Sequence, residues 1–243
     1  MAGKPPDKDD RSQLPASAKN AEVDAFLRKI AAMPTARPAS GRGKLIFAMD
    51  ATASRQPSWD HACKIQGEMF EATAALGGLD VQLVFYRGFN ECKASKWLST
   101  AASLHNAMRA VFCLGGETQI ARVLRHALKE ADAQKIGALV FVGDAMEEKL
   151  DELCGLAGQL GLLGVPVFVF HEGHEAAAER AFKEIARLSH GAYCRFDASS
   201  ADELRALLGA VAAYAAGGHR ALANYSKATG GAALLIARQL GGS

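Results

Sequence analysis

Short runs of β-branched and aromatic residues alternate along the chain with longer segments whose apolar residues recur at helical spacing. The runs predict strands at 44–50, 81–86, 136–143, 165–170 and 192–196. The longer segments predict helices near 59–76, 100–113, 118–131, 175–188 and 201–216, and one that ends near 163. Strands that alternate with helices in this way pair in parallel. We therefore predict an α/β fold with a doubly wound, mostly parallel sheet.

One segment departs from this alternation. Arg87–Asn90 has the composition of a turn and follows the strand at 81–86 directly. Glu91–Ser95 can then pair back against that strand, and a strand that returns through a tight turn is antiparallel. We therefore expect one short antiparallel strand at the edge of the sheet.

The chain has 243 residues, of which 49% are hydrophobic, enough for one good core. Residues 1–20 are rich in Pro, Asp, Lys and Ser and are expected to form a disordered tail. A helix and a proline-containing linker are predicted over 21–43. The main domain is predicted to span 44–217, and 218–243 form a C-terminal extension. Within it, 232–240 are predicted to form a short apolar helical segment, for which packing on the domain's own surface is favoured over docking on a partner.

Charge and cysteine usage narrow the class of protein. The net charge of +2 leaves no dominant basic field, so nucleic acid is not the expected partner. The five cysteines form no CxxC pair, and their odd number argues for reduced thiols in the cytosol. The start of the chain lacks the apolar stretch of a signal peptide, and no apolar run reaches the roughly 18–20 residues that span a bilayer. We therefore expect a cytoplasmic protein that binds neither nucleic acid nor membrane.

Asp50 ends the first predicted strand, and Thr52 and Ser54 follow it at alternate positions. Open α/β sheets bind ligands at the carboxyl ends of their strands. A carboxylate and two hydroxyls at that place offer three hard oxygen donors, which suit Mg²⁺ or Mn²⁺ rather than Zn²⁺. The sequence therefore predicts a divalent-cation site after the first strand.

Two further turns are expected to meet at the same edge of the sheet. Gly115-Gly116-Glu117-Thr118 opens a predicted helix, and its glycines allow a tight turn that brings Thr118 close to the ion. Gly143-Asp144 ends the strand at 136–143. The three turns together offer two carboxylates and three hydroxyls, which water would complete to a near-octahedral shell.

The order of these residues resembles the metal-ion-dependent adhesion site (MIDAS) of von Willebrand factor type A (VWA) domains. The pattern of that family is Asp-x-Ser-x-Ser after the first strand, then a distant Thr and a distant Asp. The residues that match it in order and setting are Asp50, Thr52, Ser54, Thr118 and Asp144. A threonine replaces the first serine of the pattern and keeps its hydroxyl. The stretches FAMDATASRQPSWD, GGETQIARVL and LVFVGDAMEE are also similar to bacterial cytoplasmic members of the family, some of which are encoded beside a DnaJ-like protein.

The resemblance covers roughly residues 44–217 and implies a Rossmann-like VWA fold and a non-catalytic, metal-dependent binding module. In that family the protein donors leave one coordination position of the cation open, and an acidic side chain of another protein fills it. The partner implied here is a DnaJ-like or other chaperone-type protein. Arg55 and Glu117 flank the site and are candidates for contact with the partner. Arg55 either adds attraction for an anion or only pairs with a nearby acid at the surface.

Three alternatives stay open. Asp50 and Asp144 can merely cap the helices that follow them, or the fold can keep a degenerate site that binds no metal. The third is a haloacid-dehalogenase-like, Mg²⁺-dependent phosphohydrolase. The residues that fit its order are Asp50, Thr118, Lys129 or Lys135, and Gly143-Asp144. Its general acid should lie two residues after the nucleophile, where Thr52 stands, and a hydroxyl cannot transfer that proton near neutral pH.

Two other patterns favour plain structural interpretations. His171 and His174 are three residues apart, whereas a zincin helix needs a spacing of four, so a solvated loop is favoured over zinc. A cluster near the predicted edge hairpin contains basic and aromatic residues of the kind that bind nucleic acid. Its members are Arg87, Phe89, Lys93, Lys96 and Trp97. Surface charge with packed aromatic rings is the favoured interpretation.

Overall fold

The computed structural model describes residues 25, 26, 28–30, 42–196 and 201–228. Six strands in this part of the chain form one sheet in the order β3-β2-β1-β4-β5-β6. They are β1 (Gly43–Asp50), β2 (Leu79–Arg87), β3 (Glu91–Leu98), β4 (Ala138–Gly143), β5 (Val167–Glu172) and β6 (Ala192–Phe196). β2 and β3 pair antiparallel, and the other neighbours pair parallel. The predicted α/β sheet with its antiparallel edge strand is confirmed.

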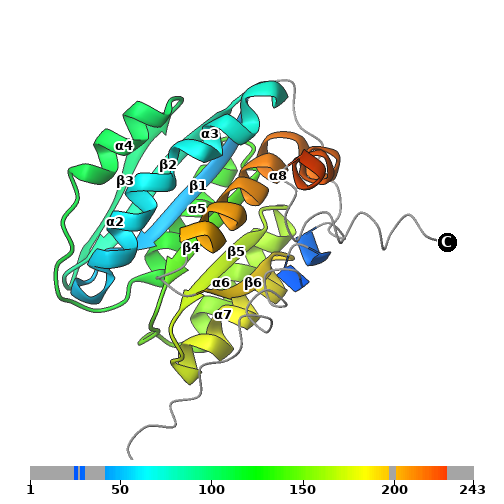
Figure 1. Cartoon of the computed structure of the whole chain (residues 1–243). Helices are drawn as coiled ribbons and strands as arrows, with labels where there is room; N and C mark the ends of the chain where they lie inside the picture. Colours follow the sequence, from blue (N-terminus) through cyan, green and yellow to red (C-terminus); the bar gives the residue numbers. More distant parts are fainter. Residues whose placement is uncertain (1–24, 27, 31–41, 197–200, 229–243) are drawn as a thin grey trace, which may run out of the picture.

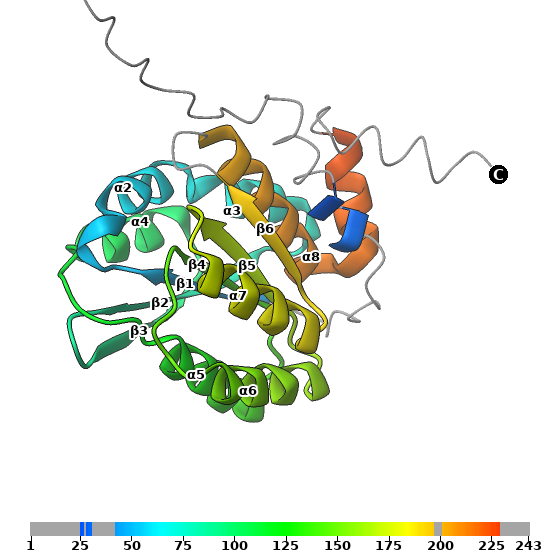
Figure 2. The same ribbon diagram turned by 90° about the horizontal axis from the view of Figure 1, so that it is seen from below.

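Helices cover both faces of the sheet, which lies between two layers in Figures 1 and 2. One layer contains α2 (Gln56–Ile65), α3 (Gly67–Thr73), α4 (Ala101–Arg109) and α8 (Ala201–Ala228). The other contains α5 (Ile120–Ala133), α6 (Leu150–Leu162) and α7 (Ala176–Leu188). Two short 3-10 helices lie beside α2 and α3, namely η1 (Ala53–Arg55) and η2 (Ala74–Leu76).

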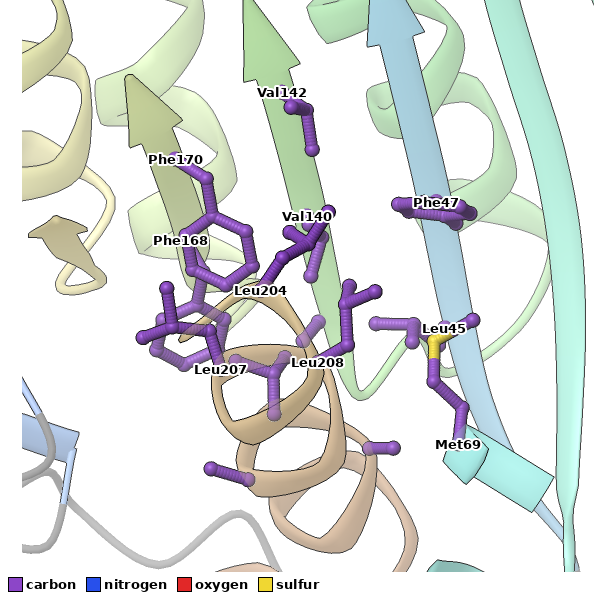
Figure 3. Packing of buried hydrophobic residues seen from close by; sticks show 14 of the residues in the cluster. Leu45, Phe47, Met69, Val140, Val142, Phe168, Phe170, Leu204, Leu207 and Leu208 are labelled. Atoms are coloured by element: carbon purple, nitrogen blue, oxygen red, sulfur yellow. The ribbon is translucent and has the colours of Figure 1, made fainter. Parts of the chain in front are cut away.

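The core is built by the alternation of side chains along the central strands. On β1, Leu45, Phe47 and Met49 pack towards the α8 layer, whereas Ile46 and Ala48 pack towards the opposite layer. Figure 3 shows leucines of α8 in contact with apolar side chains of β1, β4 and β5. The positions predicted to be buried in central strands are all buried: Phe47, Val84, Leu139, Val140, Phe141, Val167 and Val169.

Two predicted helices differ from those observed. The helix predicted over 59–76 is divided at Gln66 into α2 and α3, and its last three residues form the 3-10 helix η2. Gly67 follows the division, and glycine is a weak helix former. The helix predicted over 201–216 breaks at the glycine pair as expected, since Gly218 has a non-helical φ of 64° and ψ of −157°, but a second helical stretch follows and extends α8 to Ala228. Glycine reaches such a conformation without the penalty that a Cβ imposes, so the chain bends there between the two helical stretches.

Part of the predicted N-terminal helix also belongs to the core. Phe26 and Ile30 are buried, and the Phe26 ring packs edge-on against Phe168 and Phe170 at centroid distances of 6.1 and 5.5 Å. The predicted tail at 1–20 and the apolar segment at 232–240 lie outside the described residues. Among the helices that are described, none has the length and apolar character needed to cross a membrane.

The strand register decides which loops share an edge. Strand order reverses at β1, since the chain continues to β2 on one side and later returns to β4 on the other. Asp50 pairs with Tyr86 of β2, while Met49 pairs with Val142 of β4. The carboxyl ends of β1, β2 and β4 therefore lie side by side at a topological switch point, where folds of this kind bind ligands.

Candidate metal and partner-binding site

Asp50 lies buried at the carboxyl end of β1, and its two carboxylate oxygens have different neighbours. The amide of Thr52 donates to Oδ1 at 2.7 Å, and the hydroxyl of Tyr86 donates to Oδ2 at 3.1 Å. Burial raises the pKa of Asp50, and the charge of Asp144 raises it further. The amide and hydroxyl of Thr52 and the charge of Arg55 oppose this increase. The folded protein therefore favours ionisation of this carboxyl group less than an unfolded chain does.

The turn after β1 brings Ser54 to the turn after β4. Ser54 lies in η1, and its hydroxyl donates to Oδ2 of Asp144 at 3.0 Å. This bond joins residues 90 positions apart in the sequence. Two of the three predicted turns are thereby in direct contact.

Thr118 is tied to the same region through a reciprocal pair of hydrogen bonds. Its amide donates to Oε2 of Glu147 at 2.8 Å, and the amide of Glu147 donates to the Thr118 hydroxyl at 3.0 Å. The pair couples the start of α5 to the loop that begins at Asp144. A threonine hydroxyl has two lone pairs, so the one that accepts from Glu147 leaves the other available for a cation.

The donor set fits a hard dication. In the described part of the chain, no three His, Cys, Asp or Glu side chains converge as a metal cluster. A cation here would instead rely on two carboxylates and three hydroxyls, all of them hard oxygens suited to Mg²⁺ or Mn²⁺. The carboxylates of Asp50 and Asp144 repel one another, and a dication between them would relieve that repulsion. The residues that could hold it are Asp50, Thr52, Ser54, Thr118 and Asp144.

Arg55 differs from its expected position at the surface. Its side chain is 1% exposed and forms an ion pair with Glu172, while Nη1 lies 3.8 Å from Oδ2 of Asp144. Ser58 also donates to Glu172. Among the described residues, the Nε and Nη2 atoms of Arg55 have no hydrogen-bond partner. Arg55 therefore approaches the carboxylates of Glu172 and Asp144 from the interior of the protein, where a partner cannot reach it in this conformation.

Glu117 lies where a partner could reach it. Its side chain is exposed at the start of the Thr118 turn, and its amide donates to the carbonyl of Gly88 at 3.2 Å. The two candidates for partner contact thus have opposite environments, since Glu117 is exposed and Arg55 is buried.

Several residues at the site were missed by sequence reasoning. Tyr86 contacts Asp50 because the two pair across β1 and β2, and only the register of those strands could have indicated it. Glu148 accepts hydrogen bonds from the amides of Ile120 and Ala121, both at 2.8 Å, and so caps α5. No local signal predicts a helix cap that lies 27 or 28 residues further along the chain.

The capping interpretation of the two aspartates is only partly correct. Asp50 accepts the Thr52 amide, which is a local turn bond. Asp144 has no such role at α6, because that helix begins after Lys149 without a side-chain cap. Its side chain instead accepts from Ser54 across the sheet edge.

His171 also departs from its prediction. It is buried at the end of β5, and its Nδ1 lies 2.9 Å from the hydroxyl of Tyr193, whereas His174 is exposed in the following loop. The favoured solvated loop is therefore wrong for His171 and correct for His174.

Gly116 has a close contact that Gly115 lacks. A Cβ atom on Gly116 would overlap the backbone of Gly88, whereas one on Gly115 would meet no heavy atom within 4 Å. We expect Gly116→Ala to lower the free energy of unfolding by about 1–3 kcal/mol, as overpacking does. Gly115→Ala is the matched control and should leave it nearly unchanged. Chemical denaturation of both variants measures the difference, and equal values would contradict the close approach.

No protein-family model and no curated protein matches the sequence. Several solved structures do match. The SpRpn10 VWA domain is 14% identical with a TM-score of 0.54, over 67% of this chain and 94% of that one. Proximal thread matrix protein 1 (PTMP1) from the mussel byssus is 16% identical with a TM-score of 0.56, over 75% and 48%. A D319A mutant of the PilB minor pilin from Streptococcus sanguinis is 11% identical with a TM-score of 0.52, over 72% and 62%.

These likenesses show the fold, which is that of a VWA domain: a Rossmann-like, mostly parallel sheet between two helical layers. The chain spans less than two thirds of the PilB and PTMP1 chains. A further PTMP1 structure, 16% identical with a TM-score of 0.52 over 73% of this chain and 49% of that one, has a zinc-occupied MIDAS motif.

Proposed function

We propose that this chain is a non-catalytic protein-binding module that holds Mg²⁺ or Mn²⁺ at the edge formed by β1 and β4. The observation that carries the proposal is the environment of Asp50, a buried carboxylate whose pKa is raised by burial and by the nearby charge of Asp144. The zinc-occupied MIDAS motif of PTMP1 supports a divalent cation in this fold. A bound dication would supply one open coordination position to a carboxylate from another protein.

The residues of the chain prepare this site for its ligand. Thr52 and Tyr86 orient the Asp50 carboxylate, and Ser54 orients that of Asp144. Glu147 holds Thr118 in place through the reciprocal bonds. Such support keeps the donors in position before the ligand arrives, which reduces the ordering cost of binding. The sequence resemblance extends the proposal to a bacterial cytoplasmic complex with a DnaJ-like or other chaperone-type partner.

Calorimetric titration with Mg²⁺ and Mn²⁺ tests the proposal directly. The wild type should bind one ion, and Asp50→Ala should abolish binding because it removes a charged ligand. Asp132→Ala removes an exposed aspartate near the end of α5 and is the matched control that should bind normally. Absence of binding to the wild type would contradict the metal site. Metal-dependent turnover of p-nitrophenyl phosphate would instead favour the phosphohydrolase, which the matches described above do not support.

A further inference from the structure

Three exposed apolar side chains gather beside the proposed metal site. Phe89 is 70% exposed, Phe112 is 61% exposed and Leu114 is 47% exposed. They make up half of the six large hydrophobic residues that are exposed in the described part of the chain, and the other three belong to or follow α6. We call Phe89, Phe112 and Leu114 the apolar rim. The predicted packing of the aromatic residues near β3 is therefore wrong for Phe89, whereas Trp97 packs against the core as predicted.

Backbone hydrogen bonds connect the apolar rim to the site. The amide of Leu114 donates to the carbonyl of Ala51 at 2.9 Å, directly after Asp50. The amide of Gly88 in turn donates to the carbonyl of Leu114 at 3.3 Å. In Figure 1 the green loop that carries Leu114, between α4 and α5, passes the turn after β1 at the lower left. The rim and the site are therefore adjacent parts of one edge.

Side-chain contacts also hold the rim in place. Arg87 lies over the Phe112 ring with 4.1 Å between its guanidinium carbon and the ring centroid. Its Nη1 donates to the Phe112 carbonyl at 2.8 Å, and the rest of its guanidinium pairs with Glu91. The ring is thus fixed in an exposed position instead of folding into the core. Large aromatic side chains held exposed in this way are typical anchors of protein interfaces.

Charge determines which occupant the combined surface suits. The edge carries the carboxylates of Asp50, Asp144 and Glu117, while the nearby Arg55 and Arg87 are already paired with Glu172 and Glu91. Without a metal ion, this edge therefore repels an acidic ligand. With a dication it offers one strong site for a carboxylate beside an apolar surface. The ligand that fits this surface is a protein segment that presents both a carboxylate and an apolar side chain.

We infer that the metal site and the apolar rim form one docking surface for an extended partner segment. The segment places an Asp or Glu on the metal and a large apolar side chain on Phe89, Phe112 and Leu114. Hydrogen-bonded backbones such as those of Ala51 and Leu114 lie about 5 Å apart, and an extended chain advances about 3.3 Å per residue. The apolar residue therefore lies roughly one to three positions from the acid. The inference rests on the proposed function and specifies its partner.

Selection from a library of random peptides displayed on phage tests this inference. The wild-type protein is the target in Mg²⁺, and bound phage are eluted first with EDTA and then with acid. EDTA should release sequences that contain an Asp or Glu with a large apolar residue one to three positions away. The most enriched sequence is then synthesised, and its Kd is measured by fluorescence anisotropy.

Variants of the protein separate the two parts of the surface. Phe89→Ser and Phe112→Ser should each weaken the peptide about tenfold, an effect typical of an interface anchor, with Mg²⁺ affinity unchanged. Leu162→Ser is the matched control, because Leu162 is 89% exposed at the end of α6, and it should bind the peptide normally. Replacing the apolar residue of the peptide by Ala should weaken its binding to the wild-type protein by a similar factor.

The possible results distinguish the inference from the proposed function. If Asp50→Ala abolishes peptide binding while both rim variants bind normally, the rim inference is overturned and the metal-dependent module stands. If only acid releases peptides and Asp50→Ala binds them normally, both are overturned. Sedimentation of the wild type completes the test: a dimer that becomes a monomer in the rim variants would assign the rim to a second copy and overturn the inference.

Discussion

Glu172→Gln should lower the free energy of unfolding by at most about 3–5 kcal/mol, the cost of removing one partner of a fully buried ion pair, because the side chain of Glu172 is 19% exposed. Arg55 is buried, and Glu172 is its ion-pair partner, with Asp144 further away at 3.8 Å. Glutamine keeps the size of the side chain and a carbonyl acceptor but removes its charge. The buried guanidinium then keeps only the more distant charge of Asp144 as compensation. For a chain of this size, such a loss lowers the Tm by at most roughly 6–20 °C.

The double variant Arg55→Met/Glu172→Gln identifies the cause of that loss. Replacing both members of a buried pair is often nearly neutral, so the double variant should recover most of the stability. Glu184→Gln is the surface control, because Glu184 pairs with the exposed Arg187, and it should hardly change the Tm. Thermal melts of the variants measure these differences. Equal melting temperatures for Glu172→Gln and Glu184→Gln would contradict a structural role for the buried pair.

The same variant has a consequence for metal binding. Glu172 draws Arg55 towards itself and away from Asp144. Once Glu172 is neutral, Asp144 is the nearest charged partner left for Arg55, and the guanidinium competes there with a cation. We therefore expect Glu172→Gln to weaken Mg²⁺ binding and Arg55→Met to strengthen it.

Asp50→Asn should stabilise the metal-free protein at neutral pH while abolishing the stabilisation by Mg²⁺. The pKa of Asp50 is raised in the folded state, first by burial and then by Asp144. The folded protein therefore holds this proton more tightly than the unfolded chain, and the free energy of unfolding falls as pH rises from about 4, the usual pKa of Asp. Asparagine has no charge to bury, so this loss disappears.

Melting curves across pH, with EDTA and with Mg²⁺, check both parts of the prediction. In EDTA the advantage of Asp50→Asn should be present near pH 7 and vanish below the unfolded pKa, where the wild-type carboxyl is protonated in both states. With Mg²⁺ at 100 times its Kd, the wild type should gain about 2.7 kcal/mol and the variant nothing. A wild type whose stability in EDTA does not fall relative to the variant with rising pH would contradict the raised pKa.

The strand and helix pattern was predictable because burial imposes a local period on the sequence. The run that ends at Asp50 is apolar on both faces, as a central parallel strand requires. The short return strand after Gly88 was likewise indicated by its turn. The break at Gly218 was indicated by the glycine pair, but the helical stretch that follows it was not, because a glycine pair does not show whether the chain then leaves the domain or continues along it.

The candidate ligands of the proposed metal site could be named from the sequence for similar local reasons. Asp50 ends one strand and Thr52 and Ser54 follow it at alternate positions, while Thr118 and Asp144 lie in two further turns expected at the same edge, and the resemblance to VWA domains supports all five. The burial of Arg55 was not predictable, because an arginine in a polar loop is ordinarily exposed. Its position depends on Glu172, which lies at the end of β5, more than a hundred residues away in the sequence.

The sequence by itself determined the class of fold and indicated the five candidate donors of the proposed metal site, since these depend on periodicity and on residues in the turns at strand and helix ends. Only the tertiary structure decided how these residues are supported. Tyr86 reaches Asp50 through strand register, and Glu147 reaches Thr118 across the sheet edge. The apolar rim also arises from two loops, around Phe89 and Phe112, that meet only in the folded chain. Such contacts depend on long-range packing, which a linear pattern does not encode.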